Sequence, residues 1–368
     1  MRIAYMVTSL GVGGAERQVI ALGERMAGRG HAITLVVLKA AQVEQWATEL
    51  PVIHLDMRKS PAGVAAGLSR AHGALRGFAP EIIHSHTFPA NMAARVLGLF
   101  HPGAAVLSTI HNVYEGGRAR MTAYRLTDAW SAHTTAVSTA AAERYVRLKA
   151  VGADKCSVLT NGIDTTEFAA DPERRAEMRR ELGVGSEFQW LATGRVVAAK
   201  DYPNLLRAFA LGSKAEPMSR LAIAGEAGRS ELEALKRLAE GLGVEGRVKW
   251  LGLRRDVPAL LDAADGFVLG SAWEGMPLAL GEAMAMEKPV VATDVGGVRE
   301  MAGECGSVVP AKAPEALAEA LVAVMRTSPE ARGAGGKAAR ERILESFSMD
   351  AKADEWERLY RRLLERRR

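Results

Sequence analysis

A chain of 368 residues with 48% hydrophobic and 25% charged residues has ordinary globular proportions, which exclude global disorder and predict about two domains. Its two cysteines, Cys156 and Cys305, have no Cys or His beside them at metal-ligand spacing, so we expect neither a disulfide framework nor a zinc site. Residues 1–10 are apolar, but glycines and charges follow them at once. This pattern fits neither a signal peptide nor a membrane span, and we expect a cytoplasmic protein.

The net charge of +5 lies in the first half of the chain. Residues 1–165 contain 17 Lys and Arg against 11 Asp and Glu, whereas the remaining residues contain 31 against 32. This excess is either a solvated surface or an attraction to anionic lipid headgroups or a phosphorylated substrate. Aromatic residues make up only 5% of the chain and are not interleaved with the basic ones, so nucleic acid is not an expected partner.

The first half alternates short apolar runs with amphipathic stretches, as a doubly wound parallel sheet requires. A helix is expected over residues 15–27, and helices lie between most of the strands. The expected strands are 3–7, 32–38, 52–55, 82–85, 105–110, 134–137 and 157–160.

The same pattern starts again after a turn at Asn161-Gly162 and a strand-to-helix break at Asp171-Pro172. Helices are expected at 230–241 and 277–286. The expected strands are 189–193, 221–224, 248–251, 266–269, 290–293 and 307–309. Two such arrays, joined near residues 161–185, predict an α/β protein with two Rossmann-like domains. Ligands of open α/β sheets bind at the carboxyl ends of the strands, so the site is expected there, in a cleft between facing sheets.

The tail, residues 351–368, places apolar side chains three and four residues apart on an otherwise charged helix. The stripe consists of Trp356, Leu359, Tyr360, Leu363 and Leu364. This helix either docks on the protein or lies on a membrane surface, and its acidic residues favour docking.

Two carboxylates, Glu274 and Glu282, flank the start of an apolar helix. Pro277 suits the first helical position, because it has no N–H to leave unpaired. The backbone N–H groups of Gly275, Met276 and Leu278 would then surround a helix N-terminus, which favours an anion such as phosphate. A carboxylate on either side of an anion site suits a ligand with hydroxyls on both sides of a phosphate group, and a nucleotide sugar is such a ligand. In the alternative interpretation the two glutamates form no binding site: one interacts with the helix dipole and the other lies on the exposed face of the helix.

Arg195 and Lys200 follow a predicted strand and precede a predicted helix. Two cations at the carboxyl end of a strand would neutralise a diphosphate, although a pair of surface cations is also common.

Gly11, Gly13 and Gly14 directly follow the first strand, but Glu16 stands where a dinucleotide-binding loop has its third glycine. A dehydrogenase is therefore disfavoured. The loop either lets the backbone approach a ligand closely or is only a tight turn.

Two groups of histidines end strands, His84-Ser85-His86 and His111-Asn112. A histidine at that edge can bind a sugar hydroxyl or move a proton near pH 7. The chain has no Asp-x-Asp triplet, the usual means of holding a divalent metal on a diphosphate, so we expect no metal site.

In this order and spacing the motifs resemble those of retaining glycosyltransferases of the GT-B fold, in glycosyltransferase family 4. The similarity covers nearly the whole chain, through Gly13-Gly14-Ala15-Glu16, His111, Asn161-Gly162-Ile163-Asp164, Gly194-Arg195 with Lys200-Asp201, and Glu274-x7-Glu282. It implies an acceptor domain at residues 1–165, a nucleotide-sugar domain at 166–348, and a final helix at 349–368 that crosses back to the first domain.

The resemblance also implies a role for each motif. Arg195 and Lys200 would hold the diphosphate and Glu282 the ribose. Glu274 would hold the donor sugar, together with the amides of Gly275, Met276 and Leu278. His111 would meet that sugar from the first domain, and Gly13 and Gly14 would pack under the diphosphate. No metal or other cofactor is implied, since a phosphate oxygen is thought to take the acceptor's proton.

The opening, residues 8–17, is similar to that of bacterial enzymes of lipopolysaccharide and surface polysaccharide synthesis. This similarity implies transfer of a hexose or N-acetylhexosamine from a UDP-sugar to a lipid-linked or other glycan acceptor. It also implies peripheral contact with the anionic inner membrane, for which Arg118, Arg120 and Arg125 are candidates. Two alternatives stay open, a UDP-sugar epimerase of the same fold and an inactive nucleotide-sugar-binding scaffold.

Overall fold

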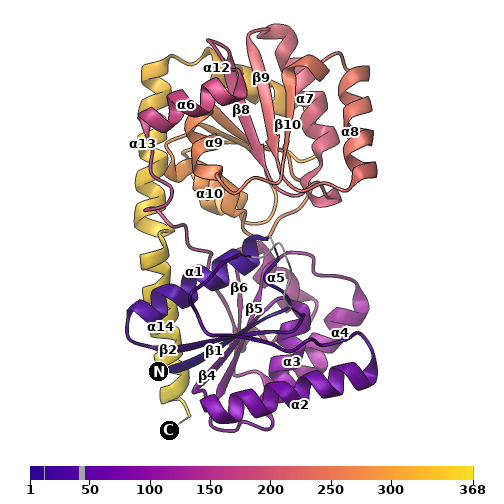
Figure 1. The fold of residues 1–368 in the computed structure, drawn as a ribbon, viewed down its shortest axis with the longest axis vertical. Helices are drawn as coiled ribbons and strands as arrows, with labels where there is room; N and C mark the ends of the chain where they lie inside the picture. The colour runs from indigo at the N-terminus through magenta and orange to yellow at the C-terminus, as the bar shows by residue number, and fades with distance from the viewer. Residues whose placement is uncertain (12, 41–45, 368) are drawn as a thin grey trace. The chain divides into compact units, whose positions relative to one another are not determined.

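The computed structural model describes residues 1–11, 13–40 and 46–367 (Figure 1). The chain divides into two compact units. The first comprises Met1–Gly162 together with Met349–Arg368, and the second comprises Ile163–Ser348. Each unit is an α/β structure built on a parallel sheet, as the alternation of apolar runs and amphipathic stretches predicts.

The first unit has, in its described residues, a parallel sheet of seven strands in the order β3-β2-β1-β4-β5-β6-β7. Helices follow most strands and cover the sheet, which is why its strands read as continuous apolar runs. The strands are β1 (Arg2–Val7), β2 (Ala32–Val37), β3 (Val52–His54), β4 (Ile82–His86), β5 (Ala105–Ile110), β6 (His133–Ala136) and β7 (Cys156–Val158). The helices are α1 (Gly14–Gly28), α2 (Pro61–Phe78), α3 (Phe88–Gly98), α4 (Arg118–Thr127) and α5 (Thr139–Arg147).

Two apolar cores lie on opposite faces of the first sheet, because successive side chains of a strand point to opposite faces. In β1, Ile3, Tyr5 and Val7 belong to the core that includes α1. Ala4 and Met6 belong to the core that includes α2 and α3. The central strand of the sheet is thus buried from both sides.

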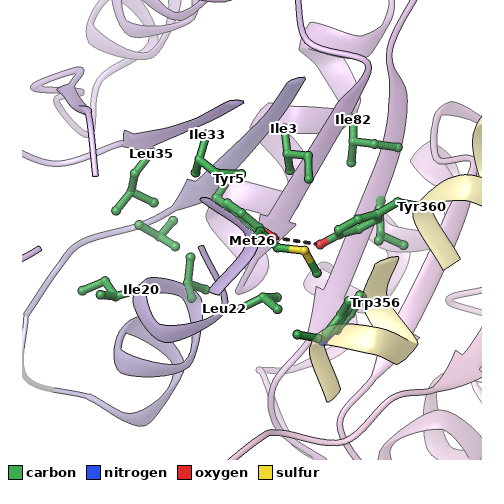
Figure 2. Close-up of a cluster of buried hydrophobic side chains, with 14 of the residues drawn as sticks. Ile3, Tyr5, Ile20, Leu22, Met26, Ile33, Leu35, Ile82, Trp356 and Tyr360 are labelled. Carbon is green, nitrogen blue, oxygen red and sulfur yellow. Dashed lines mark hydrogen bonds between the residues drawn. The ribbon is translucent and has the colours of Figure 1, made fainter. Parts of the chain in front are cut away.

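The final helix, α14 (Met349–Glu365), completes the first of these cores. Figure 2 shows Trp356 and Tyr360 of α14 beside Tyr5 and Met26, with a hydrogen bond of 3.1 Å between the hydroxyl oxygens of Tyr5 and Tyr360. Trp356 is 3% exposed and Tyr360 is fully buried. The predicted stripe therefore docks on the protein, and the alternative in which it lies on a membrane is wrong.

The second unit has, in the same described residues, a parallel sheet of six strands in the order β10-β9-β8-β11-β12-β13. Its main core gathers around Trp190 on β8, which is fully buried. The strands are β8 (Phe188–Thr193), β9 (Ser219–Ala224), β10 (Val248–Gly252), β11 (Gly266–Leu269), β12 (Val290–Thr293) and β13 (Ser307–Val309). The helices are α6 (Pro172–Leu182), α7 (Tyr202–Ala215), α8 (Arg229–Gly241), α9 (Val257–Ala263), α10 (Leu278–Ala285), α11 (Val298–Ala302), α12 (Pro314–Arg326) and α13 (Pro329–Ser346).

The predicted break at Asp171-Pro172 is confirmed as the start of α6. The Asp171 carboxylate accepts hydrogen bonds from the backbone N–H groups of Glu173 and Arg174, which caps the helix. Pro172 stands at the first helical position, where it leaves no donor unpaired.

Both sheets are doubly wound, and each reverses its strand order at one place. In the first sheet β1 lies between β2 and β4, and in the second β8 lies between β9 and β11. The loops that leave two neighbouring strands there diverge to opposite sides, which opens a crevice at the carboxyl edge of the sheet. The segments that follow β1 and β4, and β8 and β11, are therefore where ligands are expected.

Candidate functional site

The reversal point of the second sheet brings together the loops that carry Arg195, Lys200 and Glu274. One loop runs from the end of β8 to α7, and the other from the end of β11 to α10. The backbone N–H of Ala272 donates to the carbonyl of Ala199 over 2.8 Å, which ties the two loops together. Residues separated by more than 70 positions in the sequence thus form one polar cluster.

Glu274 is the centre of this cluster, and only 9% of it is exposed. Its Oε1 accepts two hydrogen bonds of 2.6 Å, one from Lys200 Nζ and one from Ser271 Oγ. Thr293 Oγ1 in turn donates to the carbonyl of Ser271 over 2.6 Å, which holds that residue in place. Within the described residues Glu274 Oε2 has no partner, so one oxygen is fixed by the protein and the other is open.

Lys200 and Arg195 differ in how they are held. Lys200 forms an ion pair with Glu274, and the next residue, Asp201, has φ +42° and caps α7 through Asn204 N–H. Arg195 is exposed and makes no hydrogen bond or ion pair with any described residue. Its charge is therefore available to an anion, whereas that of Lys200 is shared with a carboxylate.

Gly194 lets this loop turn closely around Lys200. Its φ is +142°, and a Cβ built on it would lie 2.9 Å from Lys200 Cε. The carbonyl of Gly194 accepts a hydrogen bond of 2.6 Å from the Tyr202 hydroxyl. A side chain at position 194 would strain the backbone and displace the lysine.

The helix entrance differs from the prediction by one residue. Pro277 does not occupy the first helical position; with ψ 105° it precedes α10, which begins at Leu278. Gly275 and Met276 lie in the loop before it. The carbonyl of Gly275 accepts from the N–H of Gly297 over 2.8 Å, so a third loop braces the entrance.

Sequence reasoning missed this third loop, which follows β12 and contains Gly296-Gly297. Gly296 has φ +55°, and a Cβ there would lie 2.3 Å from the carbonyl oxygen of Glu274. Only glycine allows that approach without a shift of the backbone. Paired glycines directly after an apolar strand are the signal that could have found it, as they were for Gly13-Gly14.

Glu282 lies in the middle of α10 and is 8% exposed. The alternative interpretation, in which one of the two glutamates is a solvated charge on an exposed helix face, is therefore wrong. The predicted contact of Glu282 with a ribose stays a prediction.

The glycine loop of the first unit leads into the start of α1. Gly13 precedes α1 and Gly14 is its first residue. A Cβ on Gly13 would lie 2.4 Å from Glu16 Oε2, so a larger residue there would push the end of the Glu16 side chain aside. Val12, within the predicted loop, lies outside the described residues.

His111 directly follows β5 and is half-buried. Its Nε2 lies 2.8 Å from His86 Nδ1, and its backbone N–H donates to Glu115 Oε1 over 3.1 Å. Removal of the ring from water lowers the pKa of His111 to about 4. The imidazole is neutral at pH 7, which suits a hydrogen bond to a hydroxyl rather than a stored positive charge.

The other histidines of this edge face the protein. His84 Nδ1 lies 2.7 Å from the Tyr360 hydroxyl and its Nε2 2.7 Å from Thr109 Oγ1, so both ring nitrogens are used. Burial holds the pKa values of His84 and His86 well below the usual range. The expectation that His84 faces a ligand is therefore wrong, because α14 covers it.

Glu115 is a further ionisable group of this edge that the sequence did not single out. Its Oε1 accepts from His111 N–H, and its Oε2 accepts from the Tyr124 hydroxyl over 3.0 Å. Burial raises the pKa of Glu115 to about 7, despite these hydrogen bonds.

No group of three or more His, Cys, Asp and Glu side chains in the described part of the chain is arranged to hold a metal ion. Among the same residues, no helix combines the length and the apolar character that crossing a membrane requires.

Two family models match the chain. One, described as Glycosyltransferase Family 4, matches residues 12–167, and the other, described as Glycosyl transferases group 1, matches residues 187–327. Together they cover most of both units.

Two curated relatives illustrate the similarity in sequence. A GDP-mannose-dependent alpha-(1-6)-phosphatidylinositol monomannoside mannosyltransferase of Mycolicibacterium smegmatis is 34% identical over 51% of this chain. The chain spans only about half of that relative, 52% of its length. A UDP-Gal:alpha-D-GlcNAc-diphosphoundecaprenol alpha-1,3-galactosyltransferase of Escherichia coli is 24% identical over 76% of this chain and 75% of its own length.

Solved structures show the fold. Anabaena Alr3699/HepE in complex with UDP and glucose has a TM-score of 0.87 at 20% identity, over 98% of this chain and 99% of that one. The fold is thus the two-domain GT-B fold that the sequence predicts.

Proposed function

Because the chain belongs to the glycosyltransferases, with a family 4 domain in its first unit and a group 1 domain in its second, we propose that it is a retaining hexosyltransferase or N-acetylhexosaminyltransferase. The proposed donor is a nucleotide sugar, UDP-linked in preference to other bases. The proposed acceptor is a lipid-linked or other glycan of bacterial surface polysaccharide. The UDP-dependent relative of E. coli and the UDP complex of the Anabaena protein support this choice of donor.

The observation that carries the proposal is the asymmetric carboxylate of Glu274. Lys200 and Ser271 hold Oε1, while Oε2 has no partner among the described residues. A carboxylate with one oxygen open can accept hydrogen bonds from sugar hydroxyls.

Charge supports the remaining assignments. Arg195, exposed and unpaired among the described residues, would bind the diphosphate through its planar fork, with Lys200 adding a second cation. As the bond to the leaving nucleotide breaks, both would stabilise the negative charge that develops on it. The acceptor hydroxyl would attack on the face that the nucleotide leaves and pass its proton to a phosphate oxygen. This step needs no side-chain base and no metal.

A ligand screen tests the donor class. The purified chain would be heated with UDP-, GDP-, ADP- and dTDP-sugars, and the melting temperature recorded. A donor at 100 times its dissociation constant adds about 2.7 kcal/mol of stability, which gives a readily measured shift. We expect the shift with UDP-sugars. A larger shift with GDP-mannose would indicate that the donor is GDP-mannose, as in the name of the mycobacterial relative. No shift with any nucleotide sugar would overturn the proposal.

Transfer itself is tested with a polyprenyl-diphosphate-linked sugar as acceptor. We expect an α-linked product from an α-linked donor by NMR, at a rate unchanged by EDTA. Glu274→Ala should abolish product formation without changing the melting temperature of the free protein by more than a few degrees. Interconversion of UDP-sugars without acceptor would instead indicate the epimerase, and nucleotide-sugar binding without UDP release would indicate the scaffold.

We also propose that α4 contacts the anionic membrane that carries the acceptor. Arg118, Arg120 and Arg125 are exposed on this helix, and Leu126 beside them is 73% exposed. Cations next to an exposed apolar side chain suit the interface of anionic lipids. Co-sedimentation with vesicles containing phosphatidylglycerol should fall when all three arginines are changed to alanine, and at high salt. Binding that is equal in the variant would contradict this contact.

A further inference from the structure

His86 and His111 form a close pair at the carboxyl edge of the first sheet. His86 ends β4, and His111 follows the neighbouring strand β5. His86 Nδ1 and His111 Nε2 are 2.8 Å apart, a hydrogen-bond distance, so one ring donates and the other accepts. His86 is 1% exposed, whereas His111 is only half-buried.

The surroundings of His86 decide which ring donates. Both rings are neutral, because burial lowers both of their pKa values below the usual range. His86 Nε2 is buried and has no hydrogen-bond partner among the described residues. If His111 were the donor, the single proton of His86 would have to sit on that nitrogen as an unpaired N–H. Buried unpaired N–H donors are rarer than under-satisfied acceptors, so the proton of His86 belongs on Nδ1.

The consequence reaches His111. If His86 donates, His111 Nε2 accepts, and the one proton of the neutral His111 ring is on Nδ1. No described residue takes that N–H, since the printed partners of His111 all involve Nε2, its ring face or its backbone. The ring therefore offers a ligand a neutral hydrogen-bond donor.

Two further contacts fix the geometry of the pair. Glu115 Oε1 accepts the backbone N–H of His111, which holds the main chain on one side. Thr87, which follows His86, has φ +72° and ψ 155°, a conformation that a β-branched residue rarely adopts. Its hydroxyl lies 2.8 Å from that of Thr8, in the loop after β1, and this contact keeps the turn in place. A strained turn beside a buried ring is a feature of a site that holds a side chain in one orientation.

We propose that His86 is a positioning residue that sets the tautomer of His111, so that His111 Nδ1–H donates to a hydroxyl of the sugar that the enzyme transfers. This inference rests on the proposed function for its ligand, but not for the tautomer itself. His84 contributes to the same edge without entering the pair, because both of its nitrogens are occupied by Tyr360 and Thr109.

Long-range ¹H–¹⁵N NMR of the protein labelled with ¹⁵N-histidine tests the tautomer directly. The signals of His111 are identified by their loss in His111→Gln and those of His86 by their loss in His86→Asn. We expect both rings to be protonated on Nδ1 at pH 7, with His111 Nε2 showing the shift of a hydrogen-bonded acceptor. Protonation of His111 on Nε2, or on both nitrogens, would overturn the proposal. This measurement needs no substrate, so it gives an answer even if the transfer reaction is not found.

Kinetics test the role of the pair. His86→Asn keeps an N–H donor near the position of Nδ1, whereas His86→Leu removes it at similar volume. We expect His86→Leu to lower kcat/KM for transfer about tenfold or more, which corresponds to roughly 1.4 kcal/mol, and His86→Asn to recover most of it. In the His111→Ala background His86→Leu should have no further effect, because the group it positions is gone. Equal losses in the two His86 variants, or additive losses in the double variant, would show a merely structural role. If His86→Leu does not fold, the Asn variant and the NMR assignment still decide.

Discussion

The two sheets use the same topology at their carboxyl edges but place opposite kinds of chemistry there. The second unit presents charges, the exposed guanidinium of Arg195 and the ion pair of Lys200 with Glu274. The first unit presents His86 and His111, which burial holds uncharged, and Glu115, whose pKa of about 7 leaves it only partly ionised at neutral pH. Strand order decides where the loops meet, whereas the residues on them decide whether the edge attracts an anion or pairs with hydroxyls.

Among the changes that compare the two edges, the largest effect is expected from removing the free charge of the second edge. Arg195→Ala should lower kcat by about a hundredfold to a thousandfold, the usual cost of losing a group that stabilises developing charge. Arg207→Ala, which removes another exposed arginine of the same unit on α7, is the control and should leave kcat unchanged. His111→Ala should cost less than Arg195→Ala, because a neutral hydrogen bond is weaker than a charged one. The reverse order would break the comparison between the two edges.

Glu115→Gln tests the neutral character of the first edge through pH. In the folded protein the pKa of Glu115 is raised from 4.5 to about 7. Below pH 4.5 the carboxyl is protonated in both states and costs nothing. Between pH 4.5 and about 7 only the unfolded chain loses the proton, so the wild type loses stability as the pH rises. The variant lacks this loss, so its free energy of unfolding should rise by about 1 to 3 kcal/mol relative to wild type across that pH range.

Thermal melting of wild type and Glu115→Gln at several pH values between 4.5 and 8 measures this gain. The control is Glu143→Gln, which removes a carboxylate on α5 of the same unit. If the difference in melting temperature between Glu115→Gln and wild type stays constant over the whole range, the pKa of Glu115 is not raised by folding.

A smaller effect is expected from the support of the charged edge. Ser271→Ala removes one of the two hydrogen bonds to Glu274 Oε1 but leaves Lys200 in place. We expect kcat/KM to fall about fivefold, because the carboxylate loses a positioning contact worth roughly 1 kcal/mol. Ser230→Ala on α8 is the matched control. A loss as large as that of Glu274→Ala would mean that Ser271 itself touches the substrate.

The smallest predicted effect on activity concerns the buried network of the first unit. Tyr360→Phe removes the hydroxyl that contacts both Tyr5 and His84, and should destabilise the protein by about 1 to 2 kcal/mol. Tyr114→Phe changes a tyrosine that is 52% exposed and should be neutral. Transfer activity at low temperature should be retained in both, since neither hydroxyl is in the proposed donor site. Loss of activity in the folded Tyr360 variant would connect the buried network to the ligand.

Much of this architecture can be predicted from local patterns. Apolar runs and turn residues gave the strands of both sheets, and the reversal point follows from topology. The pattern started the last two strands of the first unit one residue late, at 134–137 and 157–160 instead of His133–Ala136 and Cys156–Val158, because a boundary depends on pairing with a neighbour. Pro277 was assigned to the helix because it has no N–H to leave unpaired, whereas its ψ of 105° keeps it in the preceding loop.

The parts that escaped prediction depend on contacts between distant residues. Tyr360 covers His84 although the two residues are 276 positions apart in the sequence. Nothing near His84 in the sequence indicates this contact. The two partners of Glu274 Oε1 and the elevated pKa of Glu115 are likewise set by tertiary packing. Residue types at loops predict which groups meet a ligand, but only the packed structure shows which atoms are left free to do so.

The position of α14 has a consequence for how the protein is made. The core of the first unit needs Trp356 and Tyr360, which leave the ribosome only after Ile163–Ser348 have been synthesised. The second unit is one continuous segment and can fold as soon as it emerges. The first unit must wait, with the faces of β1 and α1 that will meet α14 open to water or to a chaperone. Newly made chains should therefore acquire protease resistance in the second unit before the first, although the first is translated earlier.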